Sequence, residues 1–364
     1  MSKKKLLVAT GGGDCPGLNA VIRAIVKSAD RNGEWEVYGS MEAFNGVLED
    51  PPEIVHLDND RVQGIHVKGG TIIKTTNKGN PLNYPIQKEN GETEHIDLSD
   101  KLIERIYNMG FEAVINIGGD GSQKISKALF DKGLNIVGVP KTIDNDLSST
   151  DLTFGFSTAV QIATDSFDKL VTTASSHNRV MILEVMGRNA GWIALHTAIA
   201  GGAELCLIPE VPFKLETIAN VIESRYDEGT GFVNIVIAEG AQMDGKLVGR
   251  KEEGDENIKL GGVGNALRFA LEDYGVKHDI RVAVLGHIQR GGSPIAFDRI
   301  LASAFGVRAF ELVRDGKYGH MVNYKNNLVS YTTLADATSS YNFVEVNNYL
   351  INTAKSIGLS FGVK

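Results

Sequence analysis

Residues 140–146 carry the side chains of this chain that are best suited to chemistry. They read Pro-Lys-Thr-Ile-Asp-Asn-Asp and place two carboxylates, Asp144 and Asp146, two residues apart beside a threonine and a lysine. The apolar run before them, Leu134 to Val139, predicts a buried strand. Because α/β sheets bind their ligands outside the carboxyl ends of strands, we expect these carboxylates to lie in a site.

A second loop, Gly118-Gly119-Asp120-Gly121-Ser122, follows the predicted strand Ala113 to Ile117. Glycines let a backbone approach phosphates closely, and an aspartate beside them can hold Mg²⁺. An ordinary turn without a ligand is the alternative for this loop alone. Together the two loops predict phosphoryl transfer to a hydroxyl group, with Asp120 on the metal and Asp144 or Asp146 as the base.

The first predicted strand, Leu6 to Thr10, ends in a glycine-rich turn at residues 11–17, and a helix-like segment follows. A helix N-terminus beyond such a turn can bind an anion. A tight turn without a ligand is the alternative. A dehydrogenase remains a weak option, because the third glycine comes one residue late for a dinucleotide-binding turn and Glu42 comes late for the ribose-binding acid.

Four arginines mark the ends of two further predicted strands. Arg188 and Arg290 follow the carboxyl ends, in the glycine-rich loops 186–192 and 286–294, where a guanidinium can grip a phosphate. Arg179 and Arg281 lie at the starts of the same strands, so they could reach a ligand only from outside their own cleft, for instance from a neighbouring subunit. Exposed salt bridges are the alternative for any one of them.

The composition is that of a soluble globular protein. The 364 residues are 42% hydrophobic and 23% charged, a length that suits two domains. A net charge of −8 argues against a nucleic-acid partner. The most apolar stretch, Ile193 to Ile208, is broken by a histidine, a glycine pair and a glutamate, so no membrane span is expected. Cys15 and Cys206 are expected to be free thiols, and the protein to be cytoplasmic.

Short apolar runs alternate with segments of helical periodicity along the chain. Runs that are apolar throughout suit strands covered on both faces, which predicts two doubly wound α/β domains with mostly parallel sheets. The polar segment Gln87 to Asp100 predicts a surface hairpin or loop, and Glu239 to Gly264 predicts a flap. The predicted strands are Leu6–Thr10, Ala113–Ile117, Leu134–Val139, Val180–Met186, Val233–Ala238 and Val282–Gly286.

These segments, in this order, resemble the 6-phosphofructokinases from Gly11 to about Ala304, and residues 142–146 with 286–294 are specific to that family. The resemblance implies an active site in the cleft between two domains. The nucleotide-binding domain would comprise residues 1–155 plus about 289–340, and the sugar-phosphate-binding domain residues 156–288 plus about 341–364. The implied reaction is phosphorylation of fructose 6-phosphate at its 1-hydroxyl by ATP with Mg²⁺, a step of glycolysis.

The resemblance also implies roles for single residues. Asp144 would be the base, Arg188 would stabilise charge on the transferring group, and Asp120 and Asp146 would serve Mg²⁺. The catalytic set is Lys141, Thr142, Asp144 and Arg188. The nucleotide-binding set is Gly13, Lys78, Gly119, Asp120, Gly121 and Ser122. The substrate-binding set is Thr142, Asp144, Asp146, Arg179, Met186, Gly187, Arg188, Glu239, Arg281, His287 and Arg290.

In this family, arginines at the places of Arg179 and Arg281 reach the 6-phosphate of the adjacent subunit. The resemblance therefore implies a homo-oligomer, a dimer or a tetramer, with shared active sites. The usual bacterial effector pocket is only partly present, because Arg23 and Glu204 match it whereas Lys27 and Val171 each replace an arginine. Control by ADP or phosphoenolpyruvate at that place is not expected.

The phosphoryl donor depends on two positions. Lys141 is typical of the pyrophosphate-using enzymes and of a related ATP-using branch, whereas many bacterial members have glycine there. Gly121 favours ATP, because the aspartate usual in the pyrophosphate branch would repel a nucleotide α-phosphate. Lys78 stands in for an arginine near the donor phosphates. The rival readings are a pyrophosphate-dependent enzyme of the same fold and an inactive sugar-phosphate-sensing homologue.

Overall fold

The computed structural model describes residues 3–88, 90–243, 246–247, 249–251 and 258–363 of the chain. The chain divides into two compact units. The first unit comprises Met1–Ser157 and Arg290–Tyr341, and the second comprises Thr158–Gln289 and Asn342–Lys364. Which ligand each unit binds stays a prediction.

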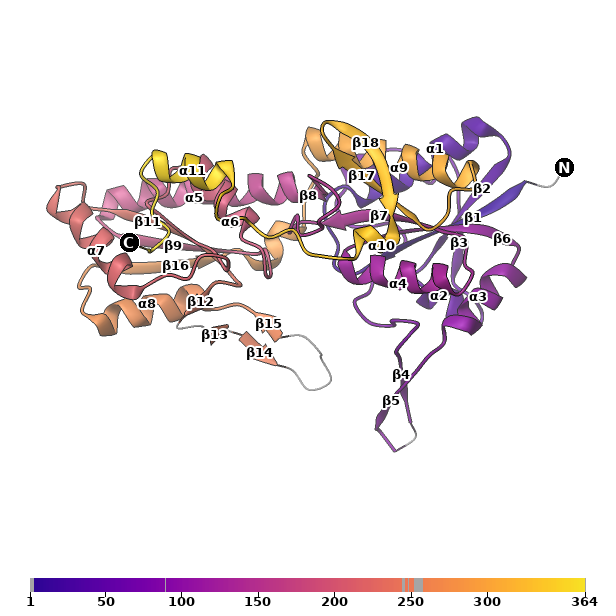
Figure 1. The fold of residues 1–364 in the computed structure, drawn as a ribbon, viewed down its shortest axis with the longest axis horizontal. Helices are drawn as coiled ribbons and strands as arrows, with labels where there is room; N and C mark the ends of the chain where they lie inside the picture. The colour runs from indigo at the N-terminus through magenta and orange to yellow at the C-terminus, as the bar shows by residue number, and fades with distance from the viewer. Residues whose placement is uncertain (1–2, 89, 244–245, 248, 252–257, 364) are drawn as a thin grey trace. The chain divides into compact units, whose positions relative to one another are not determined.

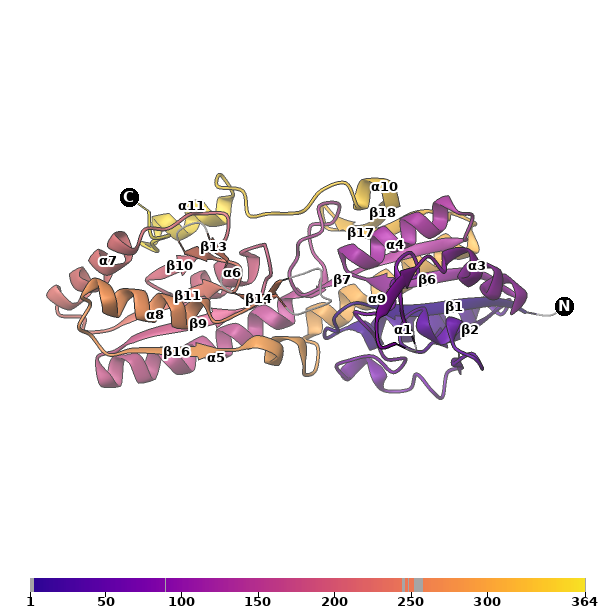
Figure 2. The same cartoon turned by 90° about the horizontal axis from the view of Figure 1, so that it is seen from below.

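The first unit is built on an eight-stranded sheet, seven strands of which follow the order β18-β17-β7-β6-β1-β2-β3 while β8 pairs with β7 (Figures 1 and 2). The pairs between β2 and β17 are parallel, and the outermost strands β3 and β18 pair antiparallel. The strands are β1 (Lys4–Gly11), β2 (Trp35–Ser40), β3 (Ile54–Leu57), β6 (Phe111–Gly118), β7 (Ile136–Thr142), β8 (Phe154–Gly155), β17 (His320–Lys325) and β18 (Leu328–Thr333).

Helices cover both faces of this sheet, with α1 and α9 on one side and α3 and α4 on the other (Figure 1). Leu102 and Ile106 of α3 and Leu129 of α4 are fully buried in one core with strand residues such as Leu7 and Val114. The helices are α1 (Leu18–Asn32), α2 (Asn45–Leu48), η1 (Ile65–Val67), α3 (Ser99–Asn108), α4 (Asp120–Asp131), α9 (Ala296–Arg314) and α10 (Leu334–Ala337).

The second unit is built on a four-stranded, fully parallel sheet in the order β10-β11-β9-β16 (Figure 2). Its strands are β9 (Val180–Val185), β10 (Leu205–Leu207), β11 (Val233–Ala238) and β16 (Ile280–Val284). Helices again lie on both faces (Figure 1), and those of one face share a core that includes Ile182, Ile222 and Leu267. The helices of the second unit are α5 (Phe156–His177), α6 (Trp192–Gly201), α7 (Leu215–Asp227), α8 (Val263–Tyr274), η2 (Gly286–Arg290) and α11 (Tyr349–Ser356).

The predicted α/β fold with mostly parallel sheets is confirmed. The segment Gln87 to Asp100, predicted to be a hairpin or a loop, contains the second strand of a hairpin whose first strand begins earlier, with β4 (Tyr84–Gln87) paired to β5 (Thr93–Ile96). The predicted flap contains two short antiparallel pairs, and residues 244–245, 248 and 252–257 within it lie outside the described residues. The pairs are β12 (Gln242–Met243) with β13 (Lys246–Leu247), and β14 (Gly249–Lys251) with β15 (Ile258–Leu260). Within the described part of the chain, no helix has the length and apolar character needed to cross a membrane.

The sequence predicted β7 to end at Val139, but the strand continues through Thr142. The continuation is paired, because Lys141 lies opposite Phe154 and Thr142 opposite Gly155 in β8. A two-residue return strand cannot be recognised from hydrophobic periodicity, which needs a longer window. The lysine and threonine expected in a loop are therefore held by the sheet itself.

Two glycines with left-handed backbone lie at the two ends of α1 and provide a test of its packing. Gly17 precedes the helix with φ 112°, and Gly33 follows it with φ 80°. A methyl group on Gly17 would meet the buried Phe154 ring at 2.7 Å, whereas one on Gly33 has nothing within 4 Å. Gly33→Ala should therefore lower the free energy of unfolding only through backbone strain, by roughly 1–2 kcal/mol.

Gly17→Ala should lower the free energy of unfolding by more, about 2–5 kcal/mol, because overpacking against Phe154 adds to the backbone strain. Urea unfolding of both variants beside the wild type measures the difference. An equal decrease in the free energy of unfolding of both variants would show that the Phe154 ring moves aside without an energetic penalty.

Candidate functional site

Three of the predicted loops meet at one edge of the first unit's sheet. Strands β1, β6 and β7 are neighbours and run parallel, and Gly11 lies opposite Gly118, which lies opposite Pro140. Their carboxyl ends therefore point the same way. The glycine-rich turn, the Gly118–Ser122 loop and the paired-aspartate segment all emerge there, as the sequence predicted.

The glycine-rich turn after β1 is held in shape by the loop that contains Lys78. Gly12 N donates a 3.0 Å hydrogen bond to Thr76 O, and the Thr75 hydroxyl donates a 2.6 Å bond to Gly12 O. The Lys78 side chain itself is exposed. The sequence predicted a role for Lys78 and missed Thr75, whose hydroxyl gives no signal without the fold.

Lys141 and Arg290 approach the same turn. The Lys141 ammonium donates to Gly13 O, and Arg290 Nη1 donates to Asp14 O at 3.4 Å. A methyl group on Gly13 would lie 3.0 Å from Arg290 Nη1, so a larger residue there would push the guanidinium aside. Arg290, predicted to bind the sugar phosphate, thus lies beside a glycine predicted to bind nucleotide phosphates.

Burial changes the chemistry of Lys141. Its side chain is buried in the first unit, and this burial lowers the pKa of its ammonium group below the usual range. The nearby positive charge of Arg290 lowers that pKa further, while Asp144 opposes the shift. A buried lysine whose pKa is lowered in this way is a candidate for a functional residue.

Asp120 begins α4 instead of lying in a loop. Its Oδ2 is 2.8 Å from the Lys124 ammonium and accepts a 2.8 Å hydrogen bond from the Tyr341 hydroxyl. Gln123 Nε2 donates 2.9 Å bonds to Gly118 O and to Val139 O, which ties the helix start to β6 and β7. The amide groups of a helix N-terminus favour anions, so this place suits the phosphates of a donor.

Two more predicted residues line this helix start. The Ser122 side chain packs against Gly11 and Gly118, where a methyl group would collide with it. Gly121 is exposed, and a methyl group built there meets nothing within 4 Å. Position 121 therefore has room for a larger side chain, which is what the donor argument from the sequence requires.

The paired aspartates flank a residue with left-handed backbone. Asn145 has φ 52°, and its side chain accepts a 3.0 Å bond from Thr153 N and donates a 3.2 Å bond to Asp151 O. Asp144 N donates to Thr142 Oγ1 at 3.0 Å, and the Asp144 side chain is 4% exposed. The asparagine thus closes the loop and fixes the backbone on which Asp144 and Asp146 stand.

In the second unit, the loop after β9 is fixed by a carboxylate. Glu239 Oε1 accepts bonds of 3.3 Å from Gly187 N and 3.0 Å from Arg188 N. Glu239 is buried, while the Arg188 side chain is exposed. The predicted residues Gly187, Arg188 and Glu239 are therefore brought together, with Arg188 presented to solvent.

Gln289 anchors the same loop and was missed from the sequence. Its Oε1 accepts a 2.7 Å bond from Met186 N, its Nε2 donates a 3.3 Å bond to Ala159 O, and its side chain is fully buried. The signal that could have identified Gln289 is its position within residues 286–294, the segment that the resemblance marks as specific to the family. His287, two residues earlier, is exposed in η2.

The remaining predicted pair, Arg179 and Arg281, lies at the opposite end of the second unit's sheet. Arg179 immediately precedes β9, and Arg281 is the second residue of β16. Both guanidinium groups form ion pairs with Asp279. The structure brings these two arginines together and separates them from Arg188 along the length of β9.

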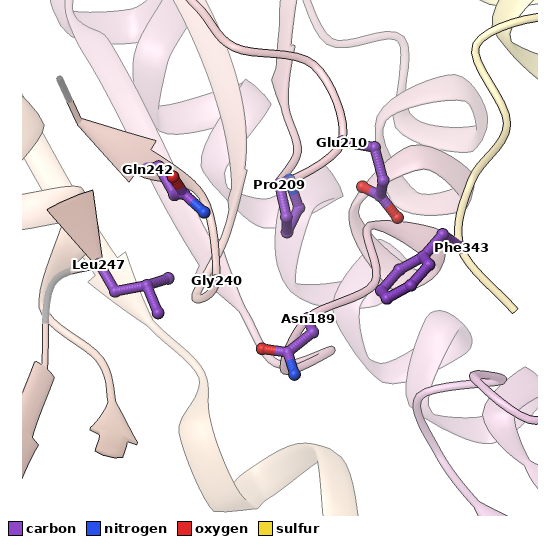
Figure 3. A pocket seen from close by; sticks show the side chains of 7 residues that line it. All are labelled: Asn189, Pro209, Glu210, Gly240, Gln242, Leu247 and Phe343. Atoms are coloured by element: carbon purple, nitrogen blue, oxygen red, sulfur yellow. The ribbon is translucent and has the colours of Figure 1, made fainter. Parts of the chain in front are cut away.

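A cavity of about 270 Å³ adjoins the Arg188 and Glu239 loops in the second unit (Figure 3). Glu210 lies in its wall, where the carboxylate accepts hydrogen bonds from Gly191 N and Val344 N. Burial raises the pKa of Glu210, and these hydrogen bonds oppose the shift. The lining residues are Asn189, Pro209, Glu210, Gly240, Gln242, Leu247 and Phe343.

Comparison with known proteins identifies relatives over the whole chain. The family model described as "Phosphofructokinase" matches residues 5–313. The ATP-dependent 6-phosphofructokinase 2 of Clostridium perfringens is 46% identical over 361 residues, 98% of each chain. The ATP-dependent 6-phosphofructokinase of Chloroflexus aurantiacus is 46% identical over 99% of this chain and 98% of its own. A pyrophosphate–fructose 6-phosphate 1-phosphotransferase of Amycolatopsis methanolica is 43% identical over 94% of this chain and 96% of its own.

Solved structures share the fold. Pichia pastoris phosphofructokinase in the T-state matches with a TM-score of 0.79 at 27% identity, over 98% of this chain and 36% of the longer yeast chain. The pyrophosphate-dependent enzyme of Marinobacter aquaeolei matches with a TM-score of 0.79 at 22% identity, over 98% of this chain and 92% of its own, which shows likeness of fold alone.

The lowered pKa of Lys141 makes a prediction about stability and pH. Between the lowered pKa and the unfolded value near 10.4, the unfolded chain binds more protons than the folded chain. The stability of the wild type relative to Lys141→Met should therefore rise as pH increases toward about 10. Urea unfolding of both proteins from pH 7 to pH 10 tests this.

Lys132→Met serves as a control whose contribution to stability should not change over this pH range. Its hydrogen bonds to Asp100 and Asp97 raise the pKa of Lys132, so its contribution should stay level up to about pH 10.4 and fall above it. A difference between wild type and Lys141→Met that stayed constant or fell with pH would contradict the argument.

Proposed function

Because this chain belongs to the phosphofructokinase family, we propose that it transfers the γ-phosphoryl group of ATP to the 1-hydroxyl of fructose 6-phosphate. The products would be fructose 1,6-bisphosphate and ADP, which makes the protein a glycolytic kinase. The observation that carries the proposal is the 46% identity, over nearly the full length of both chains, to relatives named ATP-dependent 6-phosphofructokinase.

We assign Asp144 as the general base. Its backbone is fixed by the Thr142 hydroxyl on one side and by the Asn145 loop closure on the other. A carboxylate held in one place can take the proton of the acceptor hydroxyl as the oxygen attacks phosphorus. Thr142 and Lys141, held in β7, would contact the transferring phosphoryl group.

Mg²⁺ fits the carboxylates at the ends of β6 and β7. It is commonly bound by one or two carboxylates together with substrate phosphates, and Asp120 and Asp146 can supply these oxygens. The Asp120 side chain is 16% accessible, and its Oδ2 is already paired with a cation, the Lys124 ammonium at 2.8 Å. No cluster of three or more His, Cys, Asp or Glu side chains suited to a metal occurs in the described ranges. When bound, Mg²⁺ would neutralise charge that develops on the donor phosphates.

We assign the acceptor sugar mainly to the loops that follow the strands of the second unit. Met186, Gly187, Glu239 and His287 of the second unit would bind the sugar, and Arg188 would stabilise charge on the transferring group. The exposed Arg188 guanidinium on a backbone fixed by Glu239 supports its role, since an electrostatic stabiliser must be oriented before the reaction begins. Arg290 would contact the sugar phosphate from beside the glycine-rich turn.

Pyrophosphate is the rival donor. Lys141 and the 43% identity to a pyrophosphate-dependent relative favour it. We prefer ATP because Gly121 leaves open the space in which the resemblance to the family places the α-phosphate. Gly13, Gly119, Asp120, Ser122 and Lys78 would complete the nucleotide site.

We further propose a homo-oligomer with shared sites, a dimer or a tetramer. The placement of Arg179 and Arg281 at the amino ends of their strands supports it, because the other sugar-phosphate residues of the second unit follow carboxyl ends. We propose the cytoplasm as the location, and the free, buried cysteines Cys15 and Cys206 accord with a reducing compartment.

Replacing the base tests the chemistry. Asp144→Asn keeps the size of the side chain but cannot take a proton, so kcat should fall by roughly 10²–10⁴-fold. The KM for fructose 6-phosphate should stay within a few-fold, measured by steady-state kinetics at saturating ATP. Near-normal kcat in a correctly folded variant would remove Asp144 from the role of base.

Adding a carboxylate at position 121 tests the donor. Two unit charges about 4 Å apart repel by roughly 4 kcal/mol at an effective dielectric of 20, nearly three orders of magnitude in binding. Gly121→Asp should therefore destroy the use of ATP, while any weak use of pyrophosphate survives or rises. The measurement is kcat/KM for both donors.

Gly121→Ala is the matched control, because it adds a methyl group into open space without charge and should leave ATP use nearly unchanged. A wild-type protein that prefers pyrophosphate would overturn the donor assignment. An aspartate variant that still used ATP well would show that Gly121 does not discriminate.

A further inference from the structure

The two arginines at the amino ends of β9 and β16 share one carboxylate. Val180 lies opposite Ile280 in these parallel strands, and Arg281 lies opposite Met181. Asp279 therefore lies beside Arg179, and its backbone carbonyl accepts a 3.0 Å hydrogen bond from Val180 N. Asp279 immediately precedes β16, two residues before Arg281, and its carboxylate lies 3.0 Å from the Arg281 guanidinium.

Each oxygen of Asp279 binds a different arginine. Oδ2 accepts a 2.6 Å bond from Arg179 Nε, and Oδ1 lies 3.0 Å from Arg281 Nη2. The hydrogen bond from Arg179 and the charge of Arg281 hold the pKa of Asp279 below its usual range, so the carboxylate is ionised at neutral pH. Asp279 is thus a bridge that sets the spacing of two guanidinium groups.

The bridge leaves both arginines able to bind an anion. A guanidinium carries five N–H donors, and these contacts use one donor on each side chain. Two positive charges and one negative charge leave the trio at +1. The arginines are partly exposed, with 28% of the Arg179 side chain and 54% of the Arg281 side chain accessible. Without the bridge, like charges would separate them, and an anion would have to immobilise both side chains on binding.

We propose that Asp279 is a positioning residue, which holds Arg179 and Arg281 in register to receive the phosphate of the acceptor sugar. The inference rests on the proposed function, in which these arginines bind the 6-phosphate of fructose 6-phosphate. The opposite role, a competitor that keeps phosphate away, is disfavoured because the donors left over can bind phosphate while Asp279 stays in place.

The test is the full-length Asp279→Asn variant, assayed with saturating ATP and varied fructose 6-phosphate. The amide cannot accept charge-assisted bonds from both arginines, so KM for the sugar phosphate should rise about tenfold, the effect of one lost bond to a charged group. The value of kcat and the KM for ATP should stay within twofold. Asp279→Glu, which keeps the charge, should recover most of the affinity.

Asp315→Asn is the matched control. Asp315 is also an exposed aspartate paired with an arginine, with 41% of its side chain accessible against 42% for Asp279, and it lies in the first unit, 2.8 Å from Arg314. This substitution should leave KM unchanged, which separates loss of a general surface ion pair from loss of the bridge. Urea unfolding of both variants checks that they fold alike.

Arg281→Ser separates failure of this inference from failure of the proposed function. If Arg281→Ser raises KM but Asp279→Asn leaves it unchanged or lowers it, the arginines bind the phosphate and Asp279 does not position them. If neither substitution changes KM, the assignment of the arginines to the 6-phosphate is wrong, and the positioning role of Asp279 falls with it. A wild-type protein that does not turn over fructose 6-phosphate with either donor would overturn the proposed function itself.

Discussion

Backbone polar groups at the carboxyl ends of buried strands need partners away from water, and the candidate site is arranged around the side chains that supply them. Gln123 donates to the carbonyls of Gly118 and Val139, which fixes the start of α4 against two strands. In the second unit, Glu239 accepts from two consecutive backbone N–H groups. A buried group that loses such a partner costs about 1–3 kcal/mol, so each loop is held in one conformation before a substrate arrives.

The same arrangement places a charge where burial opposes it. Lys141 is buried and its pKa is lowered, yet its ammonium donates to Gly13 O within the turn after β1. A methionine of similar length would avoid the desolvation of an ammonium group, although it would leave that carbonyl without this donor. The chain therefore accepts a stability cost at this position, which is common where a residue is kept for chemistry.

The sequence predicted the central strands because they are covered on both faces and are apolar throughout, as in β6 and β7. It did not predict β17, which lies inside the first unit's sheet, or the outermost strands β3 and β18, which pair antiparallel. The candidate site was predictable where neighbouring residues carry it, as with Asp144 and Asp146. Partners distant in sequence were not: Gln289 meets Met186 across 103 positions, and Tyr341 meets Asp120 across 221. A local sequence pattern cannot predict such pairs, because they depend on the order of the strands in the sheet.

The length of β9 bears on how the second unit could serve one substrate. Arg179 precedes the strand and Arg188 follows it, with Val180–Val185 between them. Six strand residues at roughly 3.3 Å each span about 20 Å, which is longer than a hexose phosphate. A separation of this size does not favour one sugar phosphate being held by Arg179 and Arg188 of the same chain. It supports the proposal that, if both act on one substrate, they come from different copies of the chain. The strand length and the placement of arginines at both ends therefore support the proposed shared site, in which Asp279 would align the pair of arginines that each copy offers to its neighbour.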